Sequence, residues 1–394
     1  MKSHGEPKKI FSIYSTACLR TRTYAQQVYN YLIKNGFCYD KIFRKAGLII
    51  IDTCAFSQER QNRSMSVIQY LIKHRRKNAK IIIIGCLPAI DPSAISGIKN
   101  IYSVSSNELE KLDKIINAEI KFRSIPSVVA VKSFVPPLLN MAEPKTKYGN
   151  FSPIEYHVNI GKGCLGNCSY CSIKFVWGRM QSRALDDIIN DFRVCLSKGA
   201  KIISLETQDL GAYGIDINTT VVELMQKLFE HEGNYKIVLH DLNANWLIEY
   251  YLGLERTFVN NADKIYFINI PVQSGSNRIL RLMRRPYTIE EAKKSIFSLK
   301  KKLPNTLIWT DIMVGFPGET EKDFEETKRF MEEFKMIGGY FWLTAYSERK
   351  NTESSKMSDK VPFATIKLRV FELQMLFSKF ITTNAPVKGI SFFT

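Results

Sequence analysis

Short apolar runs alternate with amphipathic segments through the first part of the chain. The pattern predicts three strands: a short one over Lys9–Tyr14, a fully apolar one over Gly47–Asp52 and a buried one over Lys80–Gly85. Apolar residues at helical spacing predict two helices between them: Thr23–Lys34 and Ser57–Lys77. Strands joined by helices require right-handed crossovers and pair in parallel. The pattern therefore predicts an α/β domain with a parallel sheet over residues 1–135.

The periodicity stops over residues 136–152, which we interpret as a linker. Strands and helices alternate again over residues 153–377. Six strands are expected there: Tyr156–Ile160, Lys201–Glu206, Lys236–Leu239, Lys264–Ile270, Leu307–Val314 and Tyr340–Thr344. Repeated strand–helix units of this kind predict an α/β barrel, open or closed. Residues 378–394 remain as a short tail.

Composition limits the class of protein. With 394 residues, 45% of them hydrophobic, the chain is long enough for two or three domains with a substantial core. The first residues lack the apolar segment of a secretion signal, and the longest aliphatic runs are too short to span a bilayer. We therefore expect a soluble, cytoplasmic protein without a membrane partner. Eight cysteines in such a protein indicate metal binding or catalysis rather than disulfides.

The charge of the chain indicates an anionic partner. There are 56 Lys and Arg against 38 Asp and Glu, a formal net charge of +18. Such an excess attracts polyanions, because phosphate contacts release counterions, so nucleic acid is the first partner to consider. Three basic stretches are candidate phosphate contacts: Lys73–Lys77, Arg281–Arg285 and Lys300–Lys302. The alternative is a basic surface that only keeps the protein soluble.

Three cysteines of the first domain share a position relative to the predicted strands. Cys18, Cys54 and Cys86 each follow directly after one strand. In a parallel sheet they gather at the carboxyl edge, where open α/β sheets bind ligands. The alternative is that each is a small buried apolar residue.

Three further cysteines lie in one compact loop after the first barrel strand. Cys164, Cys168 and Cys171 alternate there with glycines that allow the backbone to fold tightly. Three thiolates can hold three irons of a cubane cluster and leave the fourth iron open to a ligand. Structural zinc is the alternative, although it normally uses four ligands and no His or Cys follows at finger spacing.

This spacing, with the aromatic Tyr170 before the last cysteine, resembles the radical S-adenosylmethionine superfamily. The resemblance implies a partial, open α/β barrel and a catalytic 4Fe–4S cluster on Cys164, Cys168 and Cys171. It implies that the amino and carboxylate groups of S-adenosylmethionine bind the open iron. An electron from a donor such as flavodoxin or ferredoxin would then cleave the sulfonium.

Nearly the whole chain resembles the methylthiotransferases of that superfamily. The matching motifs are Asp52–Phe56, Gly85–Pro88, Gln208–Asp216, Pro271–Ser276, Asp311–Thr320 and Tyr346–Arg349. The resemblance implies a second 4Fe–4S cluster on Cys18, Cys54 and Cys86, carrying an added sulfur that becomes methylated. A 5′-deoxyadenosyl radical made at the first cluster would activate a substrate carbon, which collects the methylthio group. The stretches 208–214 and 301–305 are most similar to the branch that modifies threonylcarbamoyl-adenosine in tRNA.

Other motif residues are candidates for binding S-adenosylmethionine or the substrate. The cofactor candidates are Tyr170, Gln208, Asp209, Gln273, Ser274, Gly315 and Glu319. Four arginines are candidates for a substrate carboxylate or phosphate: Arg179, Arg183, Arg284 and Arg285. The alternatives are structural, namely a turn that only ends a strand and arginines that are only solvated.

The chain also departs from the family pattern. The family's usual Gly and Asn are missing around Cys18, its Pro and Arg after Cys171, and an expected Arg in His240–Trp246. Because only a short tail follows residue 377, we expect the family's C-terminal RNA-binding β-barrel to be missing. A protein or peptide side chain, or a small molecule, is therefore the alternative substrate to tRNA. An inactive cluster-bearing RNA-binding or regulatory protein is the alternative from another class.

Overall fold

The structure of the protein is a computed structural model that describes residues 9–126, 129–130 and 155–383. The predicted linker, residues 136–152, lies outside this part of the chain. The chain divides into two compact units: residues 1–143 together with Phe175–Trp177, and residues 144–174 together with 178–394. Each unit contains a parallel sheet with helices, so the predicted α/β class is confirmed.

The first unit contains a five-stranded parallel sheet in the order β2-β1-β3-β4-β5. Its strands are β1 (Lys9–Ser15), β2 (Phe37–Tyr39), β3 (Leu48–Thr53), β4 (Lys80–Gly85) and β5 (Ile101–Ser105). The central strands β3 and β4 are almost entirely buried, which is why their sequences are continuous apolar runs. The sequence pattern missed β2 and β5 because edge strands are short and mix polar with apolar residues.

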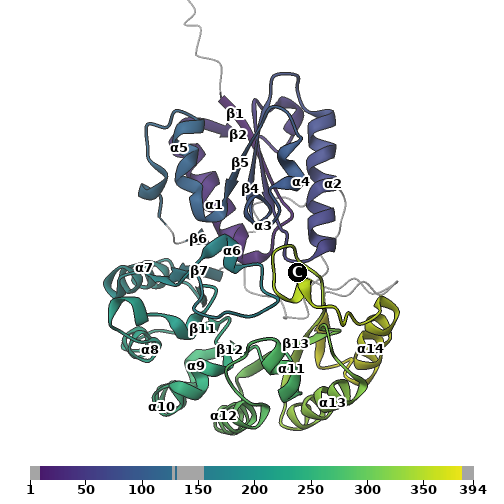
Figure 1. Ribbon diagram of the computed structural model, residues 1–394. Helices are drawn as coiled ribbons and strands as arrows, with labels where there is room; N and C mark the ends of the chain where they lie inside the picture. Colours follow the sequence, from purple (N-terminus) through teal and green to yellow (C-terminus); the bar gives the residue numbers. More distant parts are fainter. Residues whose placement is uncertain (1–8, 127–128, 131–154, 384–394) are drawn as a thin grey trace, which may run out of the picture. The chain divides into compact units, whose positions relative to one another are not determined.

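Helices cover both faces of this sheet, with α1 and α5 on one side and α2 and α4 on the other (Figure 1). The helices are α1 (Leu19–Lys34), α2 (Gln58–His74), α3 (Leu87–Ile90), α4 (Ser93–Ser96) and α5 (Leu112–Ile115). Short 3₁₀ turns occupy Phe43–Lys45, Ser106–Lys111 and Phe122–Ser124, and β6 is Val129–Ala130. Alternate residues of the strands serve the two faces, because successive side chains of a strand point in opposite directions.

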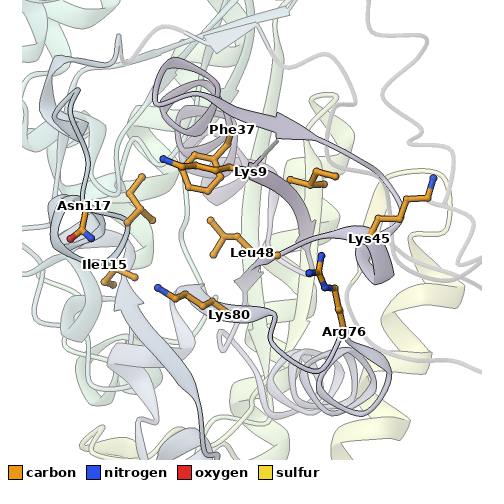
Figure 2. Close-up of a pocket in the computed structure, with 11 residues that line it drawn as sticks. Lys9, Phe37, Lys45, Leu48, Arg76, Lys80, Ile115 and Asn117 are labelled. Atoms are coloured by element: carbon orange, nitrogen blue, oxygen red, sulfur yellow. The ribbon is translucent and has the colours of Figure 1, made fainter. Parts of the chain in front are cut away.

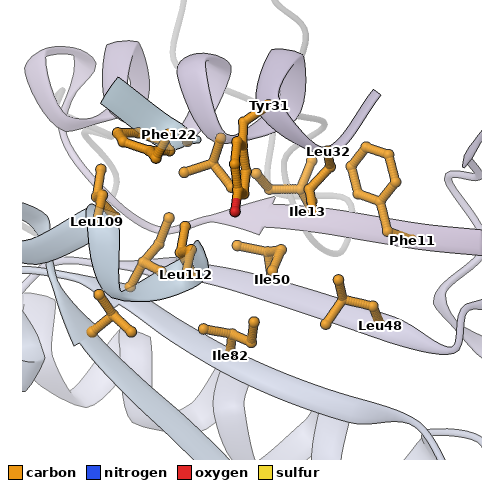
Figure 3. Close-up of a cluster of buried hydrophobic side chains, with 14 of the residues drawn as sticks. Phe11, Ile13, Tyr31, Leu32, Leu48, Ile50, Ile82, Leu109, Leu112 and Phe122 are labelled. Carbon is orange, nitrogen blue, oxygen red and sulfur yellow. The ribbon is translucent and has the colours of Figure 1, made fainter. Parts of the chain in front are cut away.

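The core on the α1 side packs helix residues against alternate strand residues (Figure 3). Ile13, Ile50 and Ile82 come from three neighbouring strands and are fully buried. Tyr31 and Leu32 of α1 pack against them, and the Tyr31 hydroxyl donates a hydrogen bond to Asp113 Oδ1 at 2.8 Å. The polar tip of the aromatic residue is therefore satisfied while its ring remains in the core.

The second unit contains seven strands that pair in parallel in the order β7-β10-β11-β12-β13-β14-β15. They are β7 (Glu155–Asn159), β10 (Ile202–Glu206), β11 (Lys236–Leu239), β12 (Ile265–Asn269), β13 (Leu307–Val314), β14 (Tyr340–Ala345) and β15 (Ile381–Thr383). Two short strands, β8 (Gly161–Lys162) and β9 (Gln181–Ser182), form a separate antiparallel pair. The six predicted barrel strands are present, with ends that differ by at most one residue.

Helices follow most of these strands and lie along the outside of the curved sheet (Figure 1). These helices are α7 (Leu185–Ser197), α8 (Val221–Phe229), α9 (Ala244–Glu249), α10 (Tyr251–Asn260), α11 (Asn277–Leu282), α12 (Ile289–Lys302), α13 (Glu321–Met336) and α14 (Phe363–Leu376). The short helix α6 (Lys174–Trp177) belongs mostly to the first unit. Capping boxes begin α12 at Thr288 and α13 at Thr320. None of the helices in the described residues is long and apolar enough to cross a membrane.

One part of the predicted tail is structured. Ile381–Thr383 forms β15, which pairs with Phe341–Leu343 of β14 and extends the parallel sheet. Three residues are too few for a periodic signal, so the sequence pattern did not predict this strand.

The first core gives a prediction about stability. Ile50→Ala is expected to lower the free energy of unfolding by about 2–5 kcal/mol, because it removes buried methyl groups and leaves a cavity. Urea unfolding measures the change. Ile33→Ala on α1 is the control, because Ile33 is exposed, and it is expected to stay within about 0.5 kcal/mol of the wild type. Equal losses for the two variants would contradict the packing described here.

Candidate iron–sulfur and S-adenosylmethionine site

The loop with Cys164, Cys168 and Cys171 begins at the carboxyl end of β7 and ends at α6. Gly163 has a φ of +92°, and a Cβ there would lie 2.1 Å from the carbonyl oxygen of Arg179, so only glycine fits. The amide of Cys164 donates to Gly178 O at 3.1 Å, and that of Cys171 donates to Cys168 O at 3.2 Å. These bonds fold the segment into one tight loop that carries all three thiols.

Hydrogen-bond donors point at the sulfur atoms of this loop. The amide of Gly166 donates to Cys164 Sγ at 3.2 Å, and Arg285 Nη1 donates to Cys168 Sγ at 3.4 Å. Burial raises the pKa of the Cys171 thiol, whereas the amides of Ile173 and Lys174 act in the opposite direction. Amide and guanidinium donors favour the thiolate form, which is the form that binds iron. The donor set therefore fits an iron–sulfur cluster.

Asp209, which follows β10, connects this loop to the rest of the sheet edge. Its Oδ2 accepts hydrogen bonds from the thiol of Cys164 at 3.2 Å and the amide of Leu165 at 3.1 Å. Its Oδ1 accepts from Asn243 Nδ2 at 2.7 Å and Trp246 Nε1 at 2.9 Å. Burial raises the pKa of Asp209, and these hydrogen bonds oppose the shift. A single carboxylate therefore joins the loops that follow β7, β10 and β11.

Arg285 is almost fully buried beside the same loop. Besides Cys168, its guanidinium donates to Asn243 Oδ1 at 3.2 Å and to Pro271 O at 2.9 Å. It also lies over the ring of Tyr287, with 5.8 Å between the guanidinium carbon and the ring centroid. A buried arginine held on several sides is suited to positioning the cluster loop rather than to meeting a large substrate.

The other predicted substrate arginines lie in different environments. Arg183 is partly buried and donates to Asn159 O at 2.6 Å and to Asp191 at 2.8 Å. Arg179 is exposed and donates to the carbonyl oxygen of Leu165 at 3.4 Å. Arg284 forms an ion pair with Glu353 in which both side chains are more than 40% exposed. Their predicted role in binding substrate stays a prediction.

Two of the predicted cofactor residues also support the cysteine loop. Gln208 Oε1 accepts a hydrogen bond from the amide of Gly163 at 2.7 Å. The ring of Tyr170 packs edge-on against Phe316, with centroids 6.3 Å apart, in a cluster that includes Met313. These two contacts attach the beginning and the end of the loop to different parts of the second unit.

The remaining cofactor candidates shape the turns after β12 and β13. Gln273 has a φ of +79°, and its backbone joins Asp311 and Met313 through hydrogen bonds of 2.7 and 2.8 Å. Ser274 Oγ lies 3.2 Å from Thr327 Oγ1. A positive φ at a residue other than glycine is uncommon and stores strain, which is typical of ligand-binding turns. Binding of S-adenosylmethionine by these residues stays a prediction.

Glu319 closes the turn after β13. Its Oε2 accepts from the amide of Gly315, which has a φ of +81°, at 2.7 Å and from Arg369 Nη1 at 2.8 Å. Both side chains of this ion pair are less than 10% exposed. Burial raises the pKa of Glu319 to about 7, although the Gly315 amide and Arg369 favour the charged form. Arg369 lies in α14, outside every motif, so the sequence did not indicate it.

The auxiliary cysteines lie at the carboxyl edge of the first unit's sheet. Thr53 pairs with Gly85, so Cys54 and Cys86 are the next residues along two neighbouring strands. Cys18 follows β1, which is the strand on the other side of β3, and precedes the first residue of α1. The sheet therefore brings all three cysteines to one edge, as the sequence pattern predicted.

The electrostatics of this edge involve a residue that the sequence analysis missed. Burial, followed by the nearby Cys18, raises the pKa of Cys54 to about 12, and the charge of Arg60 opposes the shift. Arg60 lies in the first turn of α2, and burial lowers its pKa while both thiols raise it. Its place six residues after Cys54 was the available signal. A cation beside two thiols stabilises their charged, iron-binding forms.

No three His, Cys, Asp or Glu side chains of the described residues are grouped closely enough to hold a single metal ion. A cubane cluster has a different requirement, because each thiolate binds a different iron. Both cysteine sets are compatible with that arrangement, since each is carried by loops at the carboxyl edge of a parallel sheet.

Known families match both units. The radical SAM superfamily matches residues 158–331, and a family described as uncharacterized protein family UPF0004 matches residues 11–104. The chain is 30% identical over 348 residues to the probable threonylcarbamoyladenosine tRNA methylthiotransferase of Methanocaldococcus jannaschii, covering 86% of this chain and 76% of that protein. The chain belongs to the radical S-adenosylmethionine methylthiotransferases.

Two other relatives of this methylthiotransferase carry names that give different substrates. The chain is 29% identical over 343 residues to the ribosomal protein uS12 methylthiotransferase RimO of Thermotoga sp., covering 84% and 75% of the two chains. It is 27% identical over 373 residues to the human threonylcarbamoyladenosine tRNA methylthiotransferase, covering 93% and 62%. The predicted family, enzyme class and cofactors, S-adenosylmethionine and 4Fe–4S clusters, are thereby confirmed.

Solved structures share the fold at low identity. The radical S-adenosylmethionine methyltransferase TsrM from Kitasatospora setae superposes with a TM-score of 0.61 at 11% identity, covering 89% of this chain and 77% of that chain. The cobalamin-dependent S-adenosylmethionine radical enzyme OxsB gives a TM-score of 0.56 at 11% identity, covering 95% and 58%. These similarities concern the fold alone.

The Asp209 network predicts a change in cluster content. Asp209→Ala removes the acceptor for three donors from neighbouring loops, so iron in the anaerobically reconstituted methylthiotransferase is expected to fall to about half. Iron analysis measures the change. Asp187→Ala, an exposed carboxylate on α7, is the control and should keep its iron. Full iron in Asp209→Ala would show that the network does not support the loop.

The buried Glu319 predicts a pH dependence. Its pKa is higher in the folded protein than its ordinary value of 4.5, so the folded state holds the proton more tightly. Its contribution to stability therefore falls as pH rises from about 4.5 to about 7, by at most about 1.4 kcal/mol per pH unit. Glu319→Gln is expected to remove this slope in urea unfolding of the metal-free protein, whereas exposed Glu332→Gln keeps it. An unchanged slope in Glu319→Gln would contradict the assignment.

Proposed function

We propose that this methylthiotransferase inserts a methylthio group at an unactivated C–H of a modified adenosine in tRNA. Similarity over most of the chain to the tRNA-modifying relative from Methanocaldococcus jannaschii supports this substrate most directly. The net charge of +18 suits a polyanionic partner. We infer a cytoplasmic location and a reductant such as flavodoxin or ferredoxin.

In this proposal the two cysteine sets have separate tasks. Cys164, Cys168 and Cys171 hold the cluster that binds S-adenosylmethionine, while Cys18, Cys54 and Cys86 hold the cluster that carries the transferred sulfur. When bound, these groups supply the radical and the methylthio group. The protein's own residues maintain the loops: Asp209 and Arg285 position the first set, and Arg60 favours thiolates in the second.

One arginine brings positive charge to each cysteine set. Arg285 brings a buried positive charge to Cys168, and the partly buried Arg60 brings a positive charge to Cys18 and Cys54. Hydrogen bonds and cations near cluster ligands stabilise the additional negative charge of a reduced cluster. The two arginines therefore make electron uptake easier in both places.

A second substrate class is supported by one specific observation. RimO of Thermotoga sp. is nearly as similar to this chain as the tRNA-modifying relative, and its name gives a ribosomal protein as the substrate. A protein side chain is therefore the alternative to tRNA. Both proposals use the same two cysteine sets and differ only in the substrate, which is tRNA in one and a protein in the other.

The test of the tRNA substrate is mass spectrometry of tRNA nucleosides. A strain that lacks the protein is expected to lose one methylthio-adenosine, and the wild-type gene should restore it. Cys86→Ala should fail to restore it, because it removes a proposed ligand of the sulfur-carrying cluster. Cys38→Ala is the matched control, since Cys38 is an exposed cysteine of the same unit, outside both sets. An unchanged methylthio-adenosine profile in the deletion strain would reject tRNA as the substrate.

A further inference from the structure

A cavity of about 270 Å³ lies at the amino edge of the first unit's sheet, opposite the cysteine edge (Figure 2). Leu48, the first residue of β3, forms part of its floor together with Phe37 and Ile115. Strand positions define this edge, because Lys9 begins β1 and Lys80 begins β4. Its volume is close to the lower end of the range for small-molecule sites, about 300 Å³.

The charged residues that line the cavity are all cations. Lys9, Lys45, Arg76 and Lys80 surround Leu48 in Figure 2, and no Asp or Glu lines the cavity. Lys45 lies 3.8 Å from Asp40. Within the described residues, Lys9, Arg76 and Lys80 form no ion pair, and all four cationic side chains belong to exposed residues. The cavity therefore presents three cations whose charge is not neutralised by a carboxylate.

Helix dipoles do not account for this grouping. Basic residues are common at the carboxyl ends of helices, where they interact with the free carbonyl groups, and Arg76 just after α2 has that explanation. Lys9 and Lys80 begin strands and have no helix end to complement. Because parallel strands begin at the same edge of the sheet, cations from separate segments of the chain lie around one cavity.

Further exposed cations lie close in sequence to two of the lining residues. Lys73 and Lys77 are within three residues of Arg76, and Arg44 precedes Lys45 in a 3₁₀ turn. A free nucleotide or phosphate ion would occupy only the hollow itself. Exposed cations beyond the lining residues favour a long polyanion, of which one segment enters the cavity.

We propose that this cavity is a phosphate-binding site for the RNA backbone, formed by Lys9, Lys45, Arg76 and Lys80. The inference rests on the proposed tRNA substrate and adds a contact with its backbone away from both cysteine sets. Phosphates contact the cations, and the exposed part of the apolar floor contacts sugar or base. β4 is six residues long, so the site lies about 20 Å from Cys86 at the other end of the strand. It therefore anchors RNA at a distance from the reacting carbon.

The test compares tRNA binding by the full-length wild type and by Arg76→Ala/Lys80→Ala at several salt concentrations. Fluorescence anisotropy with labelled, unfractionated tRNA gives the dissociation constant. The double variant is expected to bind roughly tenfold more weakly at low salt, and the slope of log K against log salt should fall by roughly 1 to 2. Arg76→Lys/Lys80→Arg keeps both charges and should bind as the wild type does.

The matched control is Lys198→Ala/Lys201→Ala, which removes two exposed cations from the second unit. If both double-alanine variants lose the same affinity, the effect is one of net charge and the proposed site is rejected. Pyrophosphate binding is measured for the same proteins. If Arg76→Ala/Lys80→Ala loses binding of pyrophosphate but keeps binding of tRNA, the cavity binds free phosphates and the RNA assignment is wrong. Wild-type protein that does not bind tRNA would reject the proposed function itself, whereas equal binding by variant and wild type rejects only this site.

Discussion

Three hydrogen bonds to one buried carboxylate organise the site in the second unit. Asp209 accepts from the amide of Leu165 on one oxygen and from Asn243 and Trp246 on the other. A cluster requires three thiolates in fixed positions, but they are carried by a loop, and loops are mobile unless their backbone groups are satisfied. The Asp209 network satisfies this constraint by attaching the loop to the ends of two further strands.

The same network includes a segment that departs from the family pattern. The segment His240–Trp246 lacks the arginine expected after β11. In the structure, Asn243 and Trp246 of this segment donate to Asp209, and Arg285 reaches Asn243 from the segment after α11. Arg285 therefore brings a positive charge to this network from a different part of the chain.

Periodicity and motif spacing predicted the parts of the molecule that depend on local sequence. The buried strands of both units were predicted because strands covered on both faces are continuous apolar runs, and the cysteine positions followed from the ends of those strands. Short edge strands such as β2 and β15 were missed, since three residues give no period. Arg60 and Arg369 were missed because their partners are chosen by tertiary packing.

The parallel sheet of the first unit also explains why its cysteines and the cations of the cavity lie at opposite edges. Its central strands are buried on both faces, so polar and reactive residues are confined to the strand ends. The carboxyl ends carry Cys54 and Cys86, and the amino ends carry Lys80 and the other cations of the cavity. One topology thus separates chemistry from the proposed RNA anchoring along the length of a single strand.

The central claim is that the two cysteine sets perform different steps. The most direct measurement is the formation of 5′-deoxyadenosine from S-adenosylmethionine by anaerobically reconstituted, chemically reduced protein. Cys54→Ala should still form this nucleoside, because its change lies in the sulfur-carrying set, whereas Cys168→Ala should form none. Formation of 5′-deoxyadenosine by Cys168→Ala, or its loss in Cys54→Ala with the second unit's cluster intact, would contradict the account.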